Sequence, residues 1–370
     1  PVTRRYVFLN HAAVAPVSTR VVVAMNEYLT SVLEAGGLHE DRWLRRVEEA
    51  RRHAAHLIGA SPEEIAFLKN TTEGLLTVAN GIRWREGDNV IVPSCEFPAN
   101  IYPWRNLERR LGVEVRFVKP RGVRLLPEDF FALVDGRTRA IAVSFVEYAS
   151  GFRNDLDTLG AFCRERGIFL VVDAIQGLGA LPLDVSRTPV DFLSADGHKW
   201  LLGPEGISLF YCRRERLEDL EPLEAGWMSV VNAEEYAPDY SLYTAPLRED
   251  ALRFEPGTRN NVGIFGLGEA IELILEVGVE NIAERLMLLT DHLVEGLRHK
   301  GYRILSSLEP KERSGIISFD SPRHDMADLR RRLRDAGIIV ALRHNALRVS
   351  PHFYNTLEEI DALLEALPEG

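Results

Sequence analysis

Two side chains at the ends of neighbouring strand-like segments have the chemistry of a pyridoxal phosphate site. Asp173 ends the hydrophobic run that starts at Phe169, and Lys199 follows the next such run in Asp196-Gly197-His198-Lys199. A lysine amine can hold the cofactor aldehyde as a Schiff base, and a buried acid can keep the pyridine nitrogen protonated so that the ring accepts electrons. The pair predicts a pyridoxal 5'-phosphate site with Lys199 and Asp173 as its catalytic residues.

The segments around this pair alternate between strand and helix patterns from about residue 60 to residue 215. Apolar residues in 156–166 recur at helical spacing, and Gly167 ends that run. Such alternation predicts a mostly parallel sheet covered on both faces, whose sites form at the carboxyl ends of the strands. The strand-like runs are 89–93, 113–118, 140–146, 169–174, 191–193 and 206–211.

The alternation stops at residues 226–262, a long stretch rich in Gly, Pro, Tyr and Asn that is typical of a functional loop. Helical patterns over 264–277 and 281–300 follow, and then a smaller α+β region that ends in 357–367. We expect an N-terminal arm over 1–16 associated with the small domain, a large cofactor-binding domain over 17–274 and a small C-terminal domain over 275–370.

Composition excludes several classes of function. A net charge of -11 argues against a nucleic-acid partner, because the chain would release few counterions from a phosphate backbone. The three scattered cysteines predict neither a disulfide framework nor a metal site and fit a reducing compartment. No apolar run is long enough to span a bilayer, and the first residues carry no signal-peptide pattern. We therefore expect a cytoplasmic protein without metal or membrane partner.

The chain resembles the class V aminotransferase family of fold-type I pyridoxal phosphate enzymes, which includes cysteine desulfurases and isopenicillin N epimerase-like proteins. The likeness runs nearly end to end, in blocks that keep the family's order. These blocks are Leu9–Ala13, Asn70–Gly74, Glu96–Trp104, Asp173–Gln176, Asp196–Lys199, Gly257–Asn260, and Arg348–Ser350 with Tyr354–Thr356.

The resemblance implies an α/β fold with a large domain, built on a mostly parallel seven-stranded sheet, and a small α+β C-terminal domain. It also implies a homodimer with shared active sites, because the family threonine that matches Thr258 reaches the phosphate of the partner subunit. The cofactor residues would be Thr71, Thr72, Phe97, Asp173, Gln176, His198, Lys199 and Thr258, and the amino-acid substrate would meet Arg348, Asn10 and His11.

Each matched residue also has a simpler structural interpretation. Asn70 and the threonines after it suit a helix N-cap as well as a phosphate seat, because helix N-termini provide both. Phe97 can stack on a ring or belong to the core, and Thr258 can belong to a Gly-rich turn. Asp196 stands where cysteine desulfurases have a phosphate-binding serine, so this carboxylate is expected to turn away from the phosphate.

The predicted reaction class depends on the lack of a particular cysteine. Cysteine desulfurases carry a nucleophilic cysteine shortly before the arginine block, and the corresponding stretch 339–347 has none. We therefore rank an aminotransferase that removes the α-proton of an amino acid first. The alternatives are a C–S lyase without the nucleophilic cysteine, an amino-acid epimerase and, outside enzymes, a degenerate cofactor-binding regulator.

Overall fold

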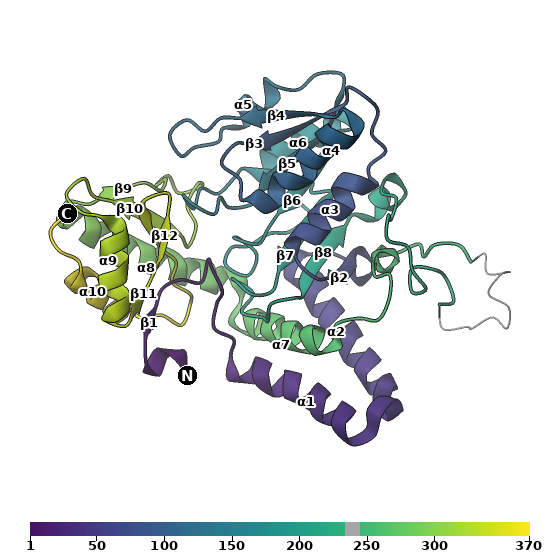
Figure 1. Cartoon of the computed structure of the whole chain (residues 1–370), viewed down its shortest axis with the longest axis horizontal. Coiled ribbons are helices and arrows are strands. Elements are labelled where there is room, and N and C mark those ends of the chain that lie inside the picture. The colour runs from purple at the N-terminus through teal and green to yellow at the C-terminus, as the bar shows by residue number, and fades with distance from the viewer. Residues whose placement is uncertain (234–244) are drawn as a thin grey trace.

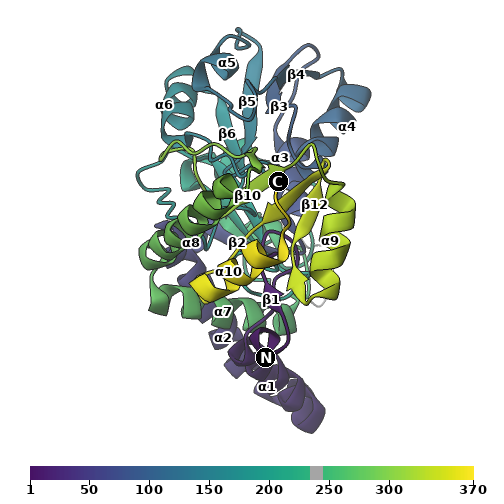
Figure 2. The same cartoon turned by 90° about the vertical axis from the view of Figure 1, so that its left-hand side faces the viewer.

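The computed structural model describes residues 1–233 and 245–370. Part of the predicted loop 226–262 therefore lies outside the described residues. Figure 1 shows a large α/β body and a smaller lobe at the C-terminal end of the chain, with the purple N-terminal segment running beside the smaller lobe. The quarter turn in Figure 2 brings the small lobe in front of the large one.

The large body is built on a seven-stranded sheet with the strand order β2-β8-β7-β6-β5-β3-β4. Pairing is parallel from β4 through β3, β5 and β6 to β7, and only β8 runs antiparallel to its neighbours. This sheet confirms the predicted fold class. Its strands are β2 (Ile65–Leu68), β3 (Asn89–Pro93), β4 (Glu114–Val118), β5 (Thr138–Ser144), β6 (Phe169–Asp173), β7 (Phe192–Asp196) and β8 (Ser208–Cys212).

Alternate residues of each central strand enter two different hydrophobic clusters. In β6, Leu170 and Val172 pack on one face of the sheet, and Phe169 and Val171 pack on the other. The first face is covered by α2 (Glu40–Ile58), α6 (Leu156–Arg166) and α7 (Asn261–Val277), and the second by α3 (Thr71–Gly81) and α4 (Tyr102–Leu111). Because both faces are dry, polar groups gather at the strand ends.

Local sequence signals explain several of the helix ends. The side chain of Asn70 accepts a hydrogen bond from the backbone N–H of Glu73 and so caps α3. Asp155 caps α6 in the same way, and Gly167 ends that helix with a positive φ of 64° that glycine adopts without strain. The remaining helices of the large body are α1 (Thr19–Ala35) and the short α5 (Pro127–Phe131).

The small lobe contains a four-stranded sheet of order β12-β13-β10-β9. Leu9 of the N-terminal arm is fully buried in the core of this lobe. In addition, β1 (Val7–Phe8) pairs in parallel with β11 (Ile338–Ile339). The other elements are α8 (Val279–His299), β9 (Arg303–Ile304), β10 (Ile317–Asp320), α9 (Met326–Asp335), β12 (Ala341–Arg343), β13 (Ala346–Val349) and α10 (Leu357–Ala366).

Element boundaries differ from the sequence prediction in one place that matters for the site. The run 191–193 predicted the strand before the lysine, but β7 continues to Asp196. Ser194 and Asp196 are polar yet buried, because β7 lies between β6 and β8 and helix α3 covers it. The strand therefore ends three residues before Lys199, and this brings the lysine close to the sheet edge.

A buried ion cluster fixes the segment that precedes α7. Glu255 is almost fully buried and accepts hydrogen bonds from Arg51 of α2 (2.7 Å), Arg259 (2.5 Å) and the backbone N–H of Phe67 (2.8 Å). Burial opposes the charge of Glu255, but the two guanidinium groups outweigh it and lower its pKa. The cluster ties α2, β2 and residues 255–259 together.

Replacing Glu255→Gln should lower the free energy of unfolding by about 3 kcal/mol, because Arg51 keeps its buried charge without a counter-charge. The loss should begin to shrink as the pH falls below the ordinary glutamate pKa of 4.5, and it should disappear only below the lowered pKa of Glu255, where this side chain is neutral in the folded parent protein as well. Urea unfolding at several pH values measures both effects.

Glu48→Gln is the matched control, because Glu48 also pairs with Arg51 (3.3 Å) but its side chain is 46% exposed. It should cost less than about 1 kcal/mol. Equal losses in the two variants would contradict the role given to burial.

Candidate active site

A cavity of about 250 Å³ lies at the carboxyl ends of β6 and β7. Most of the predicted site residues line it, although they come from both lobes of the chain. Asn10, His11 and Thr258 do not line it. The lining residues are Ala12, Ala13, Val14, Thr71, Thr72, Phe97, Ala99, Tyr148, Asp173, Ile175, Gln176, Asp196, His198, Lys199, Arg343 and Arg348.

Asp173 is buried, and Lys199 is half-buried where it lines the cavity. Asp173 ends β6, is 1% exposed and accepts a hydrogen bond from the backbone N–H of Ile175 (3.0 Å). Burial raises the pKa of Asp173 to about 6. Burial lowers the pKa of Lys199 to about 8, although the charge of Asp173 acts in the opposite direction. The lysine is therefore more often a free amine near neutral pH than an exposed lysine is, which suits a nucleophile.

The N-terminus of α3 meets the end of β7 at the opposite side of the cavity. The hydroxyl of Thr71 accepts a hydrogen bond from the backbone N–H of Asp196 (2.9 Å), so Thr71 joins helix to strand. Thr72, the next residue, lines the cavity in the first turn of the helix. Unpaired N–H groups at a helix start favour an anion such as a phosphate. Thr72 is thus better placed than Thr71 to contact one.

Asp196 and His198 face each other at this same end. The Nδ1 atom of His198 lies 2.9 Å from Oδ1 of Asp196, yet both atoms are buried without a hydrogen-bond partner. Asp196 lines the cavity and lies against the imidazole, rather than leaving the site as the sequence led us to expect. The carboxylate of Asp196 therefore holds the imidazole of His198 in place at this end of the cavity.

The amide of Gln176 is held at both ends. Its Nε2 donates to the carbonyl of Ala12 (3.0 Å), and its Oε1 accepts from the indole N–H of Trp200 (3.0 Å). An amide nitrogen has two N–H groups, so one remains for a ligand in the cavity. Gln176 is also buried, so it is not an exposed loop amide.

Two aromatic rings form one wall. Phe97 lies edge-on to Tyr148 with ring centroids 5.3 Å apart, and the amine of Lys199 is 5.5 Å from the Phe97 centroid. The Tyr148 hydroxyl is 2.6 Å from Nε2 of His344. Sequence reasoning did not include Tyr148 among the site residues, although its position just after the carboxyl end of β5 was a usable signal.

Buried acids precede both aromatic residues. Glu96 accepts a hydrogen bond from the backbone N–H of Ser144 (2.6 Å), at the end of β5. Glu147 accepts one from Asn154 (2.9 Å). Burial raises the pKa of Glu147 to about 7 and raises that of Glu96 well above its ordinary value. These side chains anchor the loops that carry Phe97 and Tyr148.

Arg348 is a buried guanidinium with donors to spare. It is 1% exposed and belongs to β13, and its Nη1 donates to the Tyr148 carbonyl (2.6 Å). Its Nε and Nη2 are buried without a partner. Burial, together with the charge of Arg343, lowers the pKa of Arg348 to about 9. Two free donors on a planar guanidinium match the two oxygens of a carboxylate.

The arm residues Asn10 and His11 pack against the small lobe. One ring nitrogen of His11 is 2.9 Å from the carbonyl of Ser350, and the other is 2.5 Å from the hydroxyl of Tyr354. Burial lowers the pKa of His11 well below its ordinary value, so the ring is neutral. Asn10 forms a β-bridge with Ser350. The structure thus gives His11 a packing role and no access to the cavity.

Thr258 and the cysteines lie away from the cavity. Thr258 is exposed on the segment that Glu255 anchors. Cys163 and Cys212 are buried, and the Sγ of Cys95 donates to Glu147 (3.6 Å). Burial raises the pKa of the Cys95 thiol far above its ordinary value, which leaves it protonated. No cysteine lines the cavity in the described part of the chain.

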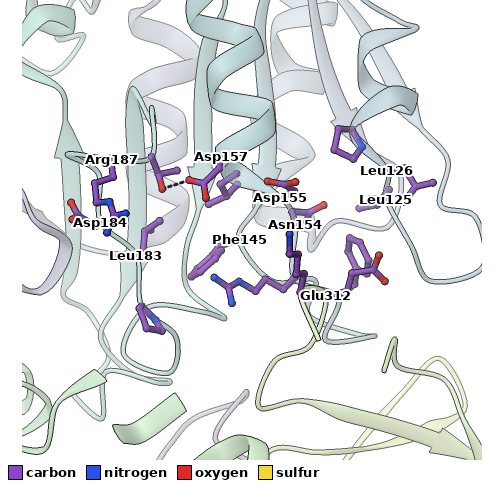
Figure 3. Close-up of a pocket in the computed structure, with 17 residues that line it drawn as sticks. Leu125, Leu126, Phe145, Asn154, Asp155, Asp157, Leu183, Asp184, Arg187 and Glu312 are labelled. Atoms are coloured by element: carbon purple, nitrogen blue, oxygen red, sulfur yellow. Dashed lines mark hydrogen bonds between the residues drawn. The ribbon is translucent and has the colours of Figure 1, made fainter. Parts of the chain in front are cut away.

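A larger cavity of about 610 Å³ lies elsewhere on the molecule (Figure 3). Phe145 and Asn154 form part of its wall, and Glu312 of the small lobe borders it. The dashed line marks the hydrogen bond that Thr188 donates to Asp157. This cavity contains none of the predicted site residues.

Residues 1–233 and 245–370 contain no group of His, Cys, Asp and Glu side chains arranged to hold a metal ion. Within the same ranges, every helix is too short or too polar to cross a bilayer.

Comparison with known proteins places this geometry in context. The aminotransferase class-V family model matches residues 7–363. A protein named "Probable cysteine desulfurase" from Methanothermobacter thermautotrophicus is 34% identical over 100% of this chain and 96% of its own length. A cysteine desulfurase from Klebsiella pneumoniae is 34% identical over 87% of this chain and 82% of its own length.

A solved structure is similar in fold as well. The apo cysteine desulfurase from Thermococcus onnurineus NA1 superposes with a TM-score of 0.90 at 30% identity, covering 99% of this chain and 94% of that one. The similarity thus extends over both lobes.

Lys199 should be the residue that bonds covalently to pyridoxal phosphate. Borohydride reduction and peptide mapping should label Lys199 and none of the four other lysines, Lys69, Lys119, Lys300 and Lys311. The extent of labelling should rise with pH around about 8 rather than around the ordinary lysine pKa of 10.5, because the amine must be free to react.

Lys69 is the matched control. It lies exposed near the start of α3, and Glu73 raises its pKa. Label on Lys69 in place of Lys199 would disprove the assignment.

Proposed function

We propose that this chain, which belongs to the aminotransferase class-V family, is a pyridoxal phosphate-dependent C–S lyase acting on a sulfur-containing amino acid. The observation that carries the proposal is one cavity that holds a buried Asp173, a desolvated Lys199 and the free donors of Arg348. The sequence by itself ranked transamination first. The relatives named cysteine desulfurase favour C–S cleavage instead.

When bound, pyridoxal phosphate supplies an electron sink that stabilises negative charge at the substrate Cα. The residues of the cavity fit its polar ends. Thr72 and His198 would contact the phosphate, Asp173 would pair with the protonated pyridine nitrogen, and the remaining N–H of Gln176 would reach the phenolic oxygen. Phe97 would stack on the ring. The first turn of α3 offers unpaired backbone N–H groups to a phosphate at this end of the cavity.

Lys199 moves the proton at Cα. Its lowered pKa supplies a free amine close to neutral pH. Phe97 occupies the place where desulfurases have a histidine, and a phenyl ring cannot carry a proton. Arg348 holds the α-carboxylate through Nε and Nη2 and so fixes which Cα bond faces the lysine.

In the proposed reaction the sulfur is released as part of the leaving group, and no cysteine of the protein accepts it. Cys95 is a protonated thiol bound to Glu147, and the two other cysteines are buried. In the elimination, the Cα–H and Cβ–S bonds break, and the sulfur leaves with the electron pair and takes a proton. Addition of water to the resulting aminoacrylate gives pyruvate and ammonia, with no change in oxidation state overall.

Product analysis tests the proposal. The protein loaded with cofactor, given L-cysteine or L-cystine, should release pyruvate, ammonia and sulfide or persulfide in equal amounts, and Lys199→Ala should abolish all three. A keto acid that forms only with an added amino acceptor would indicate transamination. An inverted enantiomer without sulfur release would indicate epimerisation, and no turnover with any amino acid would favour a regulator.

We also propose that two copies of the chain share their active sites through Thr258. This residue is exposed and outside its own cavity, on a segment that the Glu255 cluster holds in place. A hydroxyl in that position is available to the phosphate of a second subunit.

Mixed dimers test this sharing. Thr258→Glu should repel the phosphate and inactivate the protein, as Lys199→Ala does. When the two inactive variants are mixed and allowed to exchange subunits, one site of each hybrid contains an intact Lys199 and an intact Thr258. Activity should therefore return. Failure to recover activity when sedimentation shows hybrids, or an active monomer, would contradict the proposal.

A further inference from the structure

The cavity contains more positive charge than its own carboxylates neutralise. Lys199, Arg343 and Arg348 line it, whereas the lining carboxylates are Asp173 and Asp196. The charge of Asp173 raises the pKa of Lys199, and the carboxylate of Asp196 lies 2.9 Å from the imidazole of His198. Among the described residues, no carboxylate forms an ion pair with Arg343 or Arg348. Their recorded side-chain hydrogen bonds go to backbone carbonyls, of Leu342 (2.7 Å) and Tyr148 (2.6 Å) respectively.

Strand register explains why these two arginines lie together. β12 and β13 are antiparallel neighbours in which Ala341 pairs with Arg348 and Arg343 pairs with Ala346. Side chains two residues apart share a face, so Arg343 and Arg348 are diagonal neighbours on one face of the hairpin. Only His344 and Asn345 separate the strands, and both have positive φ, 45° and 65°. The tight turn keeps Arg343 next to the site.

Placing two like charges on a diagonal costs stability unless a ligand offsets them. Burial lowers the pKa of Lys199 and of Arg348, and the charge of Arg343 lowers both further. The guanidinium of Arg343 is therefore close enough to act on both groups. Two unneutralised like charges held close together in a cavity indicate a binding function.

We propose that Arg343 is a specificity-determining residue that binds a second anionic group of the substrate, at the far end of the sulfur substituent. The inference rests on the proposed function, in which the α-carboxylate takes the free donors of Arg348 and the phosphate lies at the α3 end. Arg343 is then the arginine of the cavity to which no group of the substrate or cofactor has been assigned. The preferred substrates are amino acids whose β-sulfur carries a further carboxylate or oxyanion, and L-cysteine itself is a poorer fit.

Equilibrium binding separates this role from catalysis. L-2-Aminosuberate and L-2-aminooctanoate have chains of equal length and no sulfur to lose, and they differ by the distal carboxylate alone. Calorimetric titration of the protein loaded with cofactor should show the aminosuberate binding about tenfold more tightly, the gain expected of a charge-assisted hydrogen bond. Arg343→Gln should remove that preference by weakening the aminosuberate complex only.

Three further variants complete the test. Arg343→Lys should keep part of the preference, because an ammonium retains the charge without the planar fork. Arg348→Gln should weaken both ligands alike and leave their ratio unchanged. Arg330→Gln, an exposed arginine of α9, should change neither ligand. An unchanged ratio in Arg343→Gln, equal weakening of both ligands, or loss of the cofactor absorbance would overturn the proposal.

The turnover of sulfur substrates gives a second readout. L-Cystine and S-sulfo-L-cysteine place a carboxylate and a sulfonate beyond the sulfur, and S-methyl-L-cysteine places neither. Arg343→Gln should raise KM for the first two only, and the response of each shows which anion the site accepts. If no substrate is cleaved, the proposed function fails, whereas the binding ratio still decides the role of Arg343.

Discussion

The removal of charged groups from water at the carboxyl edge of the seven-stranded sheet is the constraint on which the candidate site depends. Both faces of the sheet are dry, so the only polar groups that it can present lie at its strand ends. Asp173 is there with a raised pKa, and Lys199 with a lowered one. Burial therefore favours a cationic partner for the Asp173 carboxylate, and it makes the Lys199 amine a better nucleophile near neutral pH. A cofactor with a pyridine nitrogen and an aldehyde meets both needs.

The small lobe supplies what this edge lacks. Its β12–β13 hairpin brings Arg343 and Arg348 to the cavity, and it holds Tyr148 of the large body from two directions. Nη1 of Arg348 donates to the Tyr148 carbonyl, and His344 meets the Tyr148 hydroxyl. Substrate recognition therefore depends on how the two lobes are joined. The arm contributes to the same junction, because His11 contacts Ser350 and Tyr354 of the small lobe while the carbonyl of Ala12 accepts a hydrogen bond from Gln176 of the large body.

The hairpin also separates this chain from the desulfurases that it resembles. Those enzymes carry a nucleophilic cysteine shortly before the arginine block, whereas here the two-residue turn His344-Asn345 leads directly into the strand of Arg348. The chemistry assigned to the site therefore needs no sulfur acceptor on the protein. Arg343 lines the cavity and no cysteine does among the described residues. This arrangement fits the proposed recognition of a charged substituent better than transfer of its sulfur to the protein.

The sequence by itself determined six of the seven strands of the large sheet, all except β2, most helices, and the placing of Asp173 and Lys199 at neighbouring strand ends. These follow from local signals, namely apolar runs of strand length, caps such as Asn70, and the rule that sites form at strand ends. It also indicated Arg348, Phe97 and Gln176 through the family resemblance. The strand predicted from the sequence ended before the observed end of β7, because polar Ser194 and Asp196 are buried by neighbouring elements that no local pattern reveals.

Only the tertiary structure decided which residues share the cavity. Tyr148 and Arg343 lie nearly 200 residues apart, and their proximity depends on lobe packing and strand register. Thr71 and Thr72 both line the cavity, but the structure shows that the hydroxyl of Thr71 accepts a hydrogen bond from β7. It placed His11 against the small lobe and outside the cavity lining. Long-range contacts and desolvation set these outcomes, and neither can be read from residue spacing alone.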